Sequence, residues 1–238
     1  MVQQLPTDTA SAIIYPDSDG QPMADNTKQF RWIVVIKENL ELLFATNPDV
    51  FVAGDLLWYP VKGDNKTRQA PDAMVVFGRP KGDRGSYKQW EENNIPPQVV
   101  FEILSPGNRL KGMAHKLKFY ERYGVEEYYI YDPDNPELIG WQRSGEAFEI
   151  IDEMNGWVSP RLGIRFQIIS DNLEIFSPSG ERFLTYVELA QLMEQERQRA
   201  EQERQRADEA LSQLEQERQR YQALEALLRE RGINPEQL

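Results

Sequence analysis

Three ionisable side chains lie in parts of the sequence that otherwise predict a buried core. Asp72 follows a proline and opens the apolar run 73–77, and Glu102 interrupts the apolar run 99–104. Lys116 follows on a predicted helix. A carboxylate inside a buried strand is costly unless it is paired or bound to a metal ion. Two such strands and a lysine-bearing helix favour a site that holds a divalent cation and acts on a phosphodiester.

The pattern around Glu102 predicts a strand that is covered on both sides. Side chains alternate across a strand, so Glu102 shares its face with Val100 and Leu104. Carboxylates from neighbouring strands can hold Mg²⁺ through oxygen ligands, with waters and a phosphate completing the octahedron. Two alternatives stay open. Glu102 can pair with an arginine or lie at an exposed edge, and Asp72 can be an ordinary turn residue after Pro71.

Helical spacing selects the lysine. The apolar stripe of the second predicted helix comprises Leu110, Met113, Ala114, Leu117 and Tyr120. Lys116 borders this stripe because it stacks on Met113 and Tyr120 at i+3 and i+4 spacing. A row that points more to solvent comprises Lys111, His115, Lys118 and Arg122. We expect Lys116 to reach inward, and the alternative is a lysine that only lines the margin of the core.

Composition limits the classes of function. The 238 residues contain no cysteine and a single histidine, which excludes thiolate chemistry and disfavours histidine-based zinc sites and Ser-His-Asp triads. Net charge is −12, and the 12 acidic and 8 basic residues from Glu188 onward leave −8 on the rest. A broad nucleic-acid-binding surface needs clustered cations. Contact with DNA must therefore be local. The candidate loop, 78–90, carries Arg79, Lys81, Arg84 and Lys88, and a merely solvated loop is an equal alternative.

The order of predicted elements is helix, three strands, helix, strand. We expect a helix from Asn26 or Thr27 to about 46, strands at 51–59, 73–77 and 98–104, a helix at 109–123 and a strand at 127–131. Short strands at 138–143, 147–151, 163–169 and 173–176 should form appended β-hairpins. This is a mixed α/β fold. Asp55 falls inside the first strand, where a polar residue on an open face is favoured over a further acidic ligand.

Three regions are expected along the chain. Residues 1–25 predict a disordered arm, in which Ile13–Tyr15 could pair at a sheet edge. Residues 26–187 predict the globular domain, and 188–232 a long charged helix. No apolar stretch approaches 18 residues and no charged-then-apolar leader opens the chain, so we expect a cytoplasmic protein without membrane contact.

The C-terminal segment repeats with a period of seven, beginning at Glu194, Glu201 and Glu215. Only the part from 207 to 228 has a credible apolar stripe, whereas a two-stranded coiled coil needs apolar residues at both core positions. A solvated single helix and a homodimerising coiled coil therefore both remain open. Gly232 should end the helix.

Several short motifs together resemble the Uma2 family. They are Pro71-Asp72, the run Phe101-Glu-Ile-Leu-Ser-Pro106, the run Lys116-Leu-Lys-Phe-Tyr120 and the segment from Tyr123 to Pro133. The family is a bacterial group of restriction-endonuclease-like proteins, long classed as a domain of unknown function, within the PD-(D/E)XK nuclease superfamily. The resemblance covers about residues 26–180. The superfamily core is an α-β-β-β-α-β unit, which agrees with the order above.

The resemblance implies an endonuclease that uses Mg²⁺ or Mn²⁺ and acts on nucleic acid, with DNA as the expected substrate. It implies that Asp72 and Glu102 bind the metal and that Lys116 completes the catalytic set. The superfamily lysine lies two residues after the glutamate, where this chain has Leu104, so the lysine comes instead from the following helix. The alternative is a catalytically weak or inactive scaffold that acts through its C-terminal helix.

Overall fold

The computed structural model describes residues 13–170 and 172–232 and divides the chain into two compact units, Met1–Thr185 and Tyr186–Leu238. Residues 1–12 of the expected arm lie outside the described part. The first half of the first unit contains α1 (Thr27–Leu43), β1 (Val50–Ala53), β2 (Trp58–Tyr59), β3 (Ala73–Phe77), β4 (Tyr87–Lys88), η1 (Gln89–Glu91) and β5 (Val99–Ile103). The second half contains α2 (Leu110–Arg122), β6 (Glu127–Asp132), β7 (Glu137–Ser144), β8 (Ala147–Ile150), β9 (Arg165–Ile169) and β10 (Asn172–Phe176).

A mixed six-stranded sheet forms the centre of the first unit, with strand order β1-β3-β5-β6-β7-β8. All neighbouring strands are antiparallel except β5 and β6, which are parallel and are joined through α2. The predicted order α-β-β-β-α-β is confirmed by α1, β1, β3, β5, α2 and β6. The β7–β8 hairpin extends this sheet, whereas β9 and β10 pair with each other in a separate sheet.

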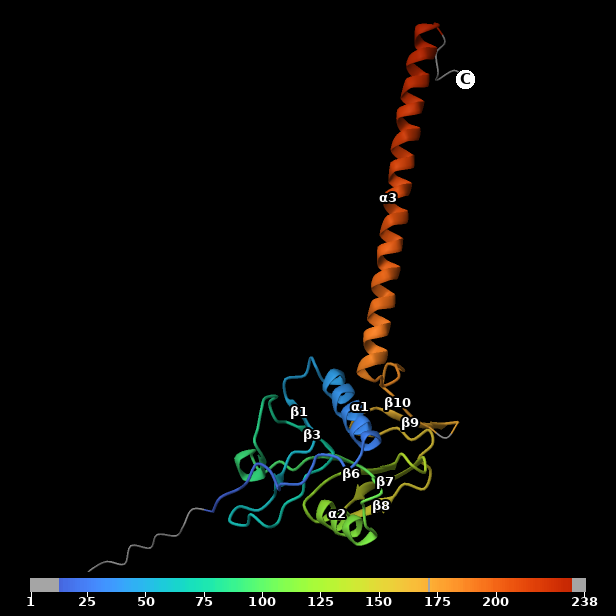
Figure 1. The fold of residues 1–238 in the computed structure, drawn as a ribbon. Helices are drawn as coiled ribbons and strands as arrows, with labels where there is room; N and C mark the ends of the chain where they lie inside the picture. The colour runs from blue at the N-terminus through green and yellow to red at the C-terminus, as the bar shows by residue number, and fades with distance from the viewer. Residues whose placement is uncertain (1–12, 171, 233–238) are drawn as a thin grey trace, which may run out of the picture. The chain divides into compact units, whose positions relative to one another are not determined.

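The sheet is covered on both faces, as the apolar pattern of β5 predicts. One core cluster joins α1 to residues such as Val99, Phe101 and Ile103 on one face of β5 and to the β9–β10 hairpin. The other joins Val100, on the opposite face, to Tyr120 of α2. Figure 1 shows α1 and α2 on opposite sides of the sheet. Side chains of β5 that point toward α2 therefore lie in a closed layer between sheet and helix.

The predicted strand 51–59 is wrong as a single element. It is two strands, β1 and β2, because the backbone turns at Asp55, which has the left-handed φ of +48°. Aspartate is one of the few non-glycine residues that adopt this conformation readily. After the turn, β2 leaves the main sheet and pairs in parallel with β4. The region 78–90, predicted as loop, contributes β4 and the start of η1.

Residues 13–25 contain no helix or strand, so Ile13–Tyr15 do not pair at a sheet edge. They contact the rest of the unit through side-chain hydrogen bonds and through the Tyr15 ring, whose centroid lies 5.3 Å from that of Tyr59 and 4.9 Å from that of Trp90. The Tyr59 hydroxyl donates to the carbonyl of Pro16 at 2.7 Å, and the Ser105 hydroxyl donates to a carboxylate oxygen of Asp25 at 2.5 Å. The segment ends at the side chain of Asn26, which caps α1 as predicted.

The second unit contains α3, an unbroken helix over Tyr186–Glu230 with no buried residue along its described length. Its polar side chains pair within the helix at i+3 and i+4, as between Glu194 and Arg197. Such exposed pairs contribute only tenths of a kcal/mol each. In the part of the chain that the structure describes, no helix is both long and apolar enough to span a bilayer.

Candidate active site

Asp72 and Glu102 lie directly across from one another on neighbouring strands. β3 and β5 are antiparallel with Ala73 opposite Phe101, and continuing this register by one residue places Asp72 opposite Glu102. Alternation along β3 turns Asp72 to the face that Met74 shares with α2. The backbone N–H of the residue after Glu102 donates to Asp72 Oδ2 at 2.6 Å. The two carboxylates thus share one buried layer, although 30 positions separate them in sequence.

Both oxygens of Glu102 accept hydrogen bonds from α2. Lys116 Nζ lies 2.6 Å from Oε2, and the Tyr120 hydroxyl donates to Oε1 at 2.6 Å. The Glu102 side chain is 3% exposed and that of Lys116 is 24% exposed. The alternatives of an arginine partner and of an exposed edge for Glu102 are therefore wrong. Lys116 does not snorkel away from the core, because its ammonium contacts the buried carboxylate.

Lys116 lies on the predicted side of α2, toward the sheet. The prediction fails at the start of the helix. Tyr120 is buried and Lys116 is half-buried on the same side, whereas His115 and Lys118 are exposed. Leu110, assigned to the apolar stripe, is 88% exposed. Ala114, one turn later in the predicted stripe, is exposed as well, and the stripe residues that pack against the sheet are Met113, Leu117 and Tyr120.

The site carries more negative than positive charge in a poorly solvated place. Burial, with repulsion from Glu102, raises the pKa of Asp72 to about 8, against the attraction of Lys116 and the Ile103 N–H. Burial alone would lower the pKa of Lys116, but the carboxylates of Glu102 and Asp72 raise it above its ordinary value. Lys116 is thereby kept as an ammonium ion, which suits it to stabilise negative charge rather than to accept a proton.

Asp55 is a third acidic neighbour, which the sequence argument disfavoured. Its N–H donates to the carbonyl of Pro71, the residue before Asp72, at 3.0 Å. Burial raises the pKa of Asp55, and Lys116 opposes that shift while Glu102 adds to it. It lies between β1 and β2 rather than on an open strand face.

Two further residues belong to this environment and escaped the sequence argument. Tyr120 was assigned only to the apolar stripe, yet it donates to Glu102. Gln29 is 6% exposed on the buried face of α1, and its amide donates to the carbonyl of Ile103 at 2.9 Å. The sequence does show Gln29 as a polar residue at helical spacing from Ile33, within the apolar face of α1. Gln29 fixes the backbone of β5 from the side opposite to α2.

A family model described as "Putative restriction endonuclease", Uma2, matches residues 4–154. This is more than half of the chain. The chain belongs to the Uma2 family. The resemblance seen in the motifs is thereby confirmed, with an extent that begins earlier and ends sooner than the expected 26–180. No curated protein matches the chain.

A solved structure that the Uma2 chain resembles is a "putative nuclease belonging to DUF820" from Anabaena variabilis. It is 16% identical, with a TM-score of 0.43, and the match covers 57% of this chain and 72% of that one.

In this Uma2 chain, Leu104 lies two residues after Glu102 and carries an apolar side chain. Leu104 is half-buried and packs into the apolar cluster between the sheet and α2. It directly follows β5, and alternation along the extended chain puts it on the same face as Glu102. An apolar side chain here extends the core, while Lys116 brings an amine to Glu102 from the opposite layer.

The donor set of the Uma2 site fits a hard divalent cation held partly by other ligands. In the described residues, no three His, Cys, Asp or Glu side chains form a ready-made metal cluster. Mg²⁺ commonly binds one or two carboxylates and completes its shell with waters and substrate phosphate. Asp72 and Glu102 supply such carboxylates. Among the buried side chains that the structure describes, only the hydroxyl of Tyr128, whose pKa is raised by burial and then by Glu102 and Asp72, lacks a hydrogen-bond partner.

The basic loop of the Uma2 domain does not offer the free cations that the sequence suggested. All four of its candidate side chains are paired with carboxylates. The pairs are Arg79–Glu92 at 2.6 Å, Arg84–Glu92 at 2.7 Å, Lys81–Glu41 at 2.8 Å and Lys88–Glu91 at 3.8 Å. These ion pairs tie the loop to α1 and η1. A role for this loop in attracting nucleic acid is therefore poorly supported, and so is its description as merely solvated.

Proposed function

We propose that this chain is an endonuclease that uses Mg²⁺ or Mn²⁺ to hydrolyse phosphodiester bonds in DNA, with Asp72, Glu102 and Lys116 as its catalytic residues. The observation that carries the proposal is the contact of 2.6 Å between Lys116 Nζ and Glu102 Oε2, beside a second carboxylate held in register across the sheet. The Uma2 membership supports nuclease-like chemistry for this site. An ordinary structural ion pair gives no reason to bury a second acid of raised pKa next to it.

Each residue has a distinct task in this mechanism. Asp72 and Glu102 would hold the cation, which when bound polarises the phosphate and lowers the pKa of a coordinated water. Ile103 N–H and Tyr120 fix the orientation of the two carboxylates by hydrogen bonds. Lys116, kept protonated, stabilises the negative charge that develops on the non-bridging phosphate oxygens. The closed layer between sheet and α2 strengthens these electrostatic interactions by excluding water.

Nicking of supercoiled plasmid DNA tests this function. We expect relaxed and linear products with Mg²⁺ or Mn²⁺ and none with EDTA, because the two acids need the cation to bring phosphate to them. The control is the Asp72→Asn variant, purified separately and assayed in the same way, so that a contaminating nuclease is recognised. Equal cleavage by that variant, or cleavage in EDTA, would contradict the proposal.

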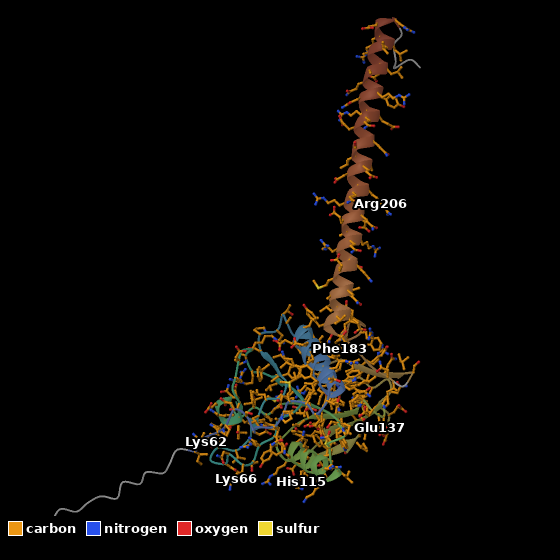
Figure 2. All side chains as sticks on the ribbon, viewed as in Figure 1. Lys62, Lys66, His115, Glu137, Phe183 and Arg206 are labelled. Atoms are coloured by element: carbon orange, nitrogen blue, oxygen red, sulfur yellow. The ribbon has the colours of Figure 1, made fainter. Side chains whose placement is uncertain are left out.

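A second proposal concerns α3, which we infer to mediate homodimerisation. Large apolar side chains are more than half exposed along its C-terminal half, namely Leu211, Leu214, Tyr221, Leu224 and Leu227. Figure 2 shows side chains projecting around the whole circumference of this helix. Apolar residues at this spacing gain by packing against a second helix. Dimerisation by α3 would also serve a scaffold that has lost nuclease activity.

We predict that the full chain has about twice its monomer mass of 27.7 kDa in light scattering. Leu214→Glu together with Tyr221→Glu should return it to the monomer, because both charges fall on the apolar stripe. Gln216→Glu together with Gln219→Glu adds the same charge on the opposite side of the helix and should leave the dimer intact. A wild-type monomer at high concentration would rule out dimerisation by this helix.

A further inference from the structure

A small cavity is lined by residues that adjoin the candidate active site in sequence and by Asp19, which interacts electrostatically with Asp55. Its volume is about 320 Å³, and its lining comprises Asp19, Leu57, Lys66, Arg68, Gln69 and Ala70. Two of these residues adjoin the site in sequence, since Leu57 follows Asp55 by two positions and Ala70 precedes Asp72 by two. The backbones of Trp58 and Gln69 pair with each other, which holds the two lining segments together.

The cavity presents two cations, Lys66 and Arg68, that form no direct ion pair in the described part of the chain, although Asp64 attracts Lys66 at longer range. Within residues 13–170 and 172–232, no salt bridge within 4.0 Å is formed by Lys66 or Arg68, in contrast to the paired cations of the basic loop. Arg68 Nη1 donates to the carbonyl of Asn65 at 2.9 Å, and its guanidinium carbon lies 6.0 Å from the centre of the Tyr59 ring. The guanidinium is thus positioned by neutral groups, and its remaining donors are available.

The surrounding turn is ordered by a short acidic side chain. Asp64 accepts hydrogen bonds from the N–H groups of Lys66 and Thr67 and from the Thr67 hydroxyl. These bonds fix the backbone on which Lys66 and Arg68 are carried. An ordered turn loses less conformational freedom when its cations bind an anion. Figure 2 labels Lys66 at the edge of the body.

We propose that this cavity is a phosphate subsite, in which Lys66 and Arg68 bind a backbone phosphate of the nucleic acid next to the phosphodiester that is cut. The inference rests on the proposed nuclease function. Nucleic-acid phosphates repeat along the strand, so a substrate placed at Asp72 and Glu102 must extend past neighbouring groups. Residues 1–187 carry a net charge of −8. Binding therefore has to come from a few well-placed cations, and a planar guanidinium is suited to phosphate.

Asp19 is the opposing element of the same cavity. Its carboxylate lines the cavity and its negative charge reaches both Asp55 and Tyr59. Asp19 is exposed, and it lies on the segment 13–25 that precedes α1. A carboxylate here repels phosphate and weakens the attraction of Lys66 and Arg68. Removing its charge should strengthen nucleic-acid binding, which is the opposite sign from removing either cation.

Binding of a fluorescein-labelled DNA duplex, followed by anisotropy in EDTA at about 50 to 200 mM salt, tests the subsite without requiring cleavage. We expect Lys66→Gln with Arg68→Gln to weaken binding at least about 10-fold and to reduce the salt slope by about 0.9, the share of the one phosphate that the two side chains bind. Asp19→Asn should tighten binding. The matched control is Lys81→Gln with Lys88→Gln, which removes the same charge from paired positions and should change affinity far less.

The outcomes separate this inference from the nuclease proposal. Weaker binding by the Lys66 and Arg68 variant alone supports the subsite even when no plasmid is nicked, and in that case only the proposed reaction fails. Equal effects of the two double variants show that general charge is responsible and overturn the subsite. No measurable binding by the wild type at low salt also overturns it. Circular dichroism of each variant checks that the substitutions do not unfold the protein.

Discussion

Replacing Asp72 with asparagine, or Glu102 with glutamine, will lower metal-dependent cleavage by about 10³-fold or more while the fold is kept. Each change removes a negative charge but preserves the shape of a side chain that is less than a tenth exposed. Charge stabilisation by a bound metal contributes several kcal/mol in the transition state, and 1.4 kcal/mol corresponds to a factor of ten. Initial rates of plasmid nicking, with calorimetric titration of Mn²⁺ into each variant, measure both consequences.

A pair of lysines on one helix provides the control. Lys116→Ala should reduce the rate by about 10²- to 10³-fold, the usual effect of removing one group that stabilises transition-state charge. Lys118→Ala, two residues on, should leave the rate close to wild type, because its side chain is 75% exposed and pairs with Glu121 rather than with the site. Similar losses for both lysines would mean that α2 matters for stability only and that Lys116 has no catalytic task.

The elements that position this site follow from local sequence rules. Apolar residues repeat about every 3.6 positions in a helix and every 2 in a strand when one side of the element is buried. These periods identified α1, β3, β5 and α2 within a few residues of their observed bounds. The same periodicity distinguished Lys116 from Lys118, because a helix assigns a direction to each residue. Glu102 was recognisable because a lone charge in an apolar strand needs a partner.

What could not be predicted depends on contacts between distant segments. Within the basic loop, Lys81 looked free because its partner Glu41 lies 40 positions before it. Asp55 looked like a strand residue because nothing local requires the left-handed turn that ends β1. Tyr120 has the spacing of a core residue, and only the register of β5 shows that its hydroxyl meets Glu102. Periodicity gives a side chain its direction but not the group that it meets.

Asp72, whose pKa is raised, also makes the stability of the metal-free protein depend on pH. The pKa of Asp72 rises from 3.8 to about 8 through burial and the repulsion of Glu102. Between these values the folded chain holds a proton that the unfolded chain has released. Stability therefore falls as pH rises, by at most about 1.4 kcal/mol per unit, and this dependence ends above pH 8. Below the unfolded pKa the contribution of Asp72 is fully present.

Urea unfolding in EDTA at intervals from pH 6 to pH 8 should show a loss of up to about 3 kcal/mol in the wild type. Asp72→Asn carries no titrating group there, so its unfolding free energy should stay nearly level and exceed that of the wild type at pH 8. A parallel decline in both proteins would assign the dependence to other groups. A level wild-type curve would mean that Asp72 is already ionised at pH 6.

Divalent cations should reverse this trend, because a carboxylate must lose its proton to bind metal. We expect the affinity for Mn²⁺ to rise by up to about tenfold per pH unit from pH 6 and to level off above about pH 8, with up to one proton released per ion. Calorimetry in two buffers of different ionisation enthalpy counts that proton. The same group would then destabilise the empty site and bind the metal in the filled one, so a site built for catalysis is expected to cost the metal-free fold part of its stability.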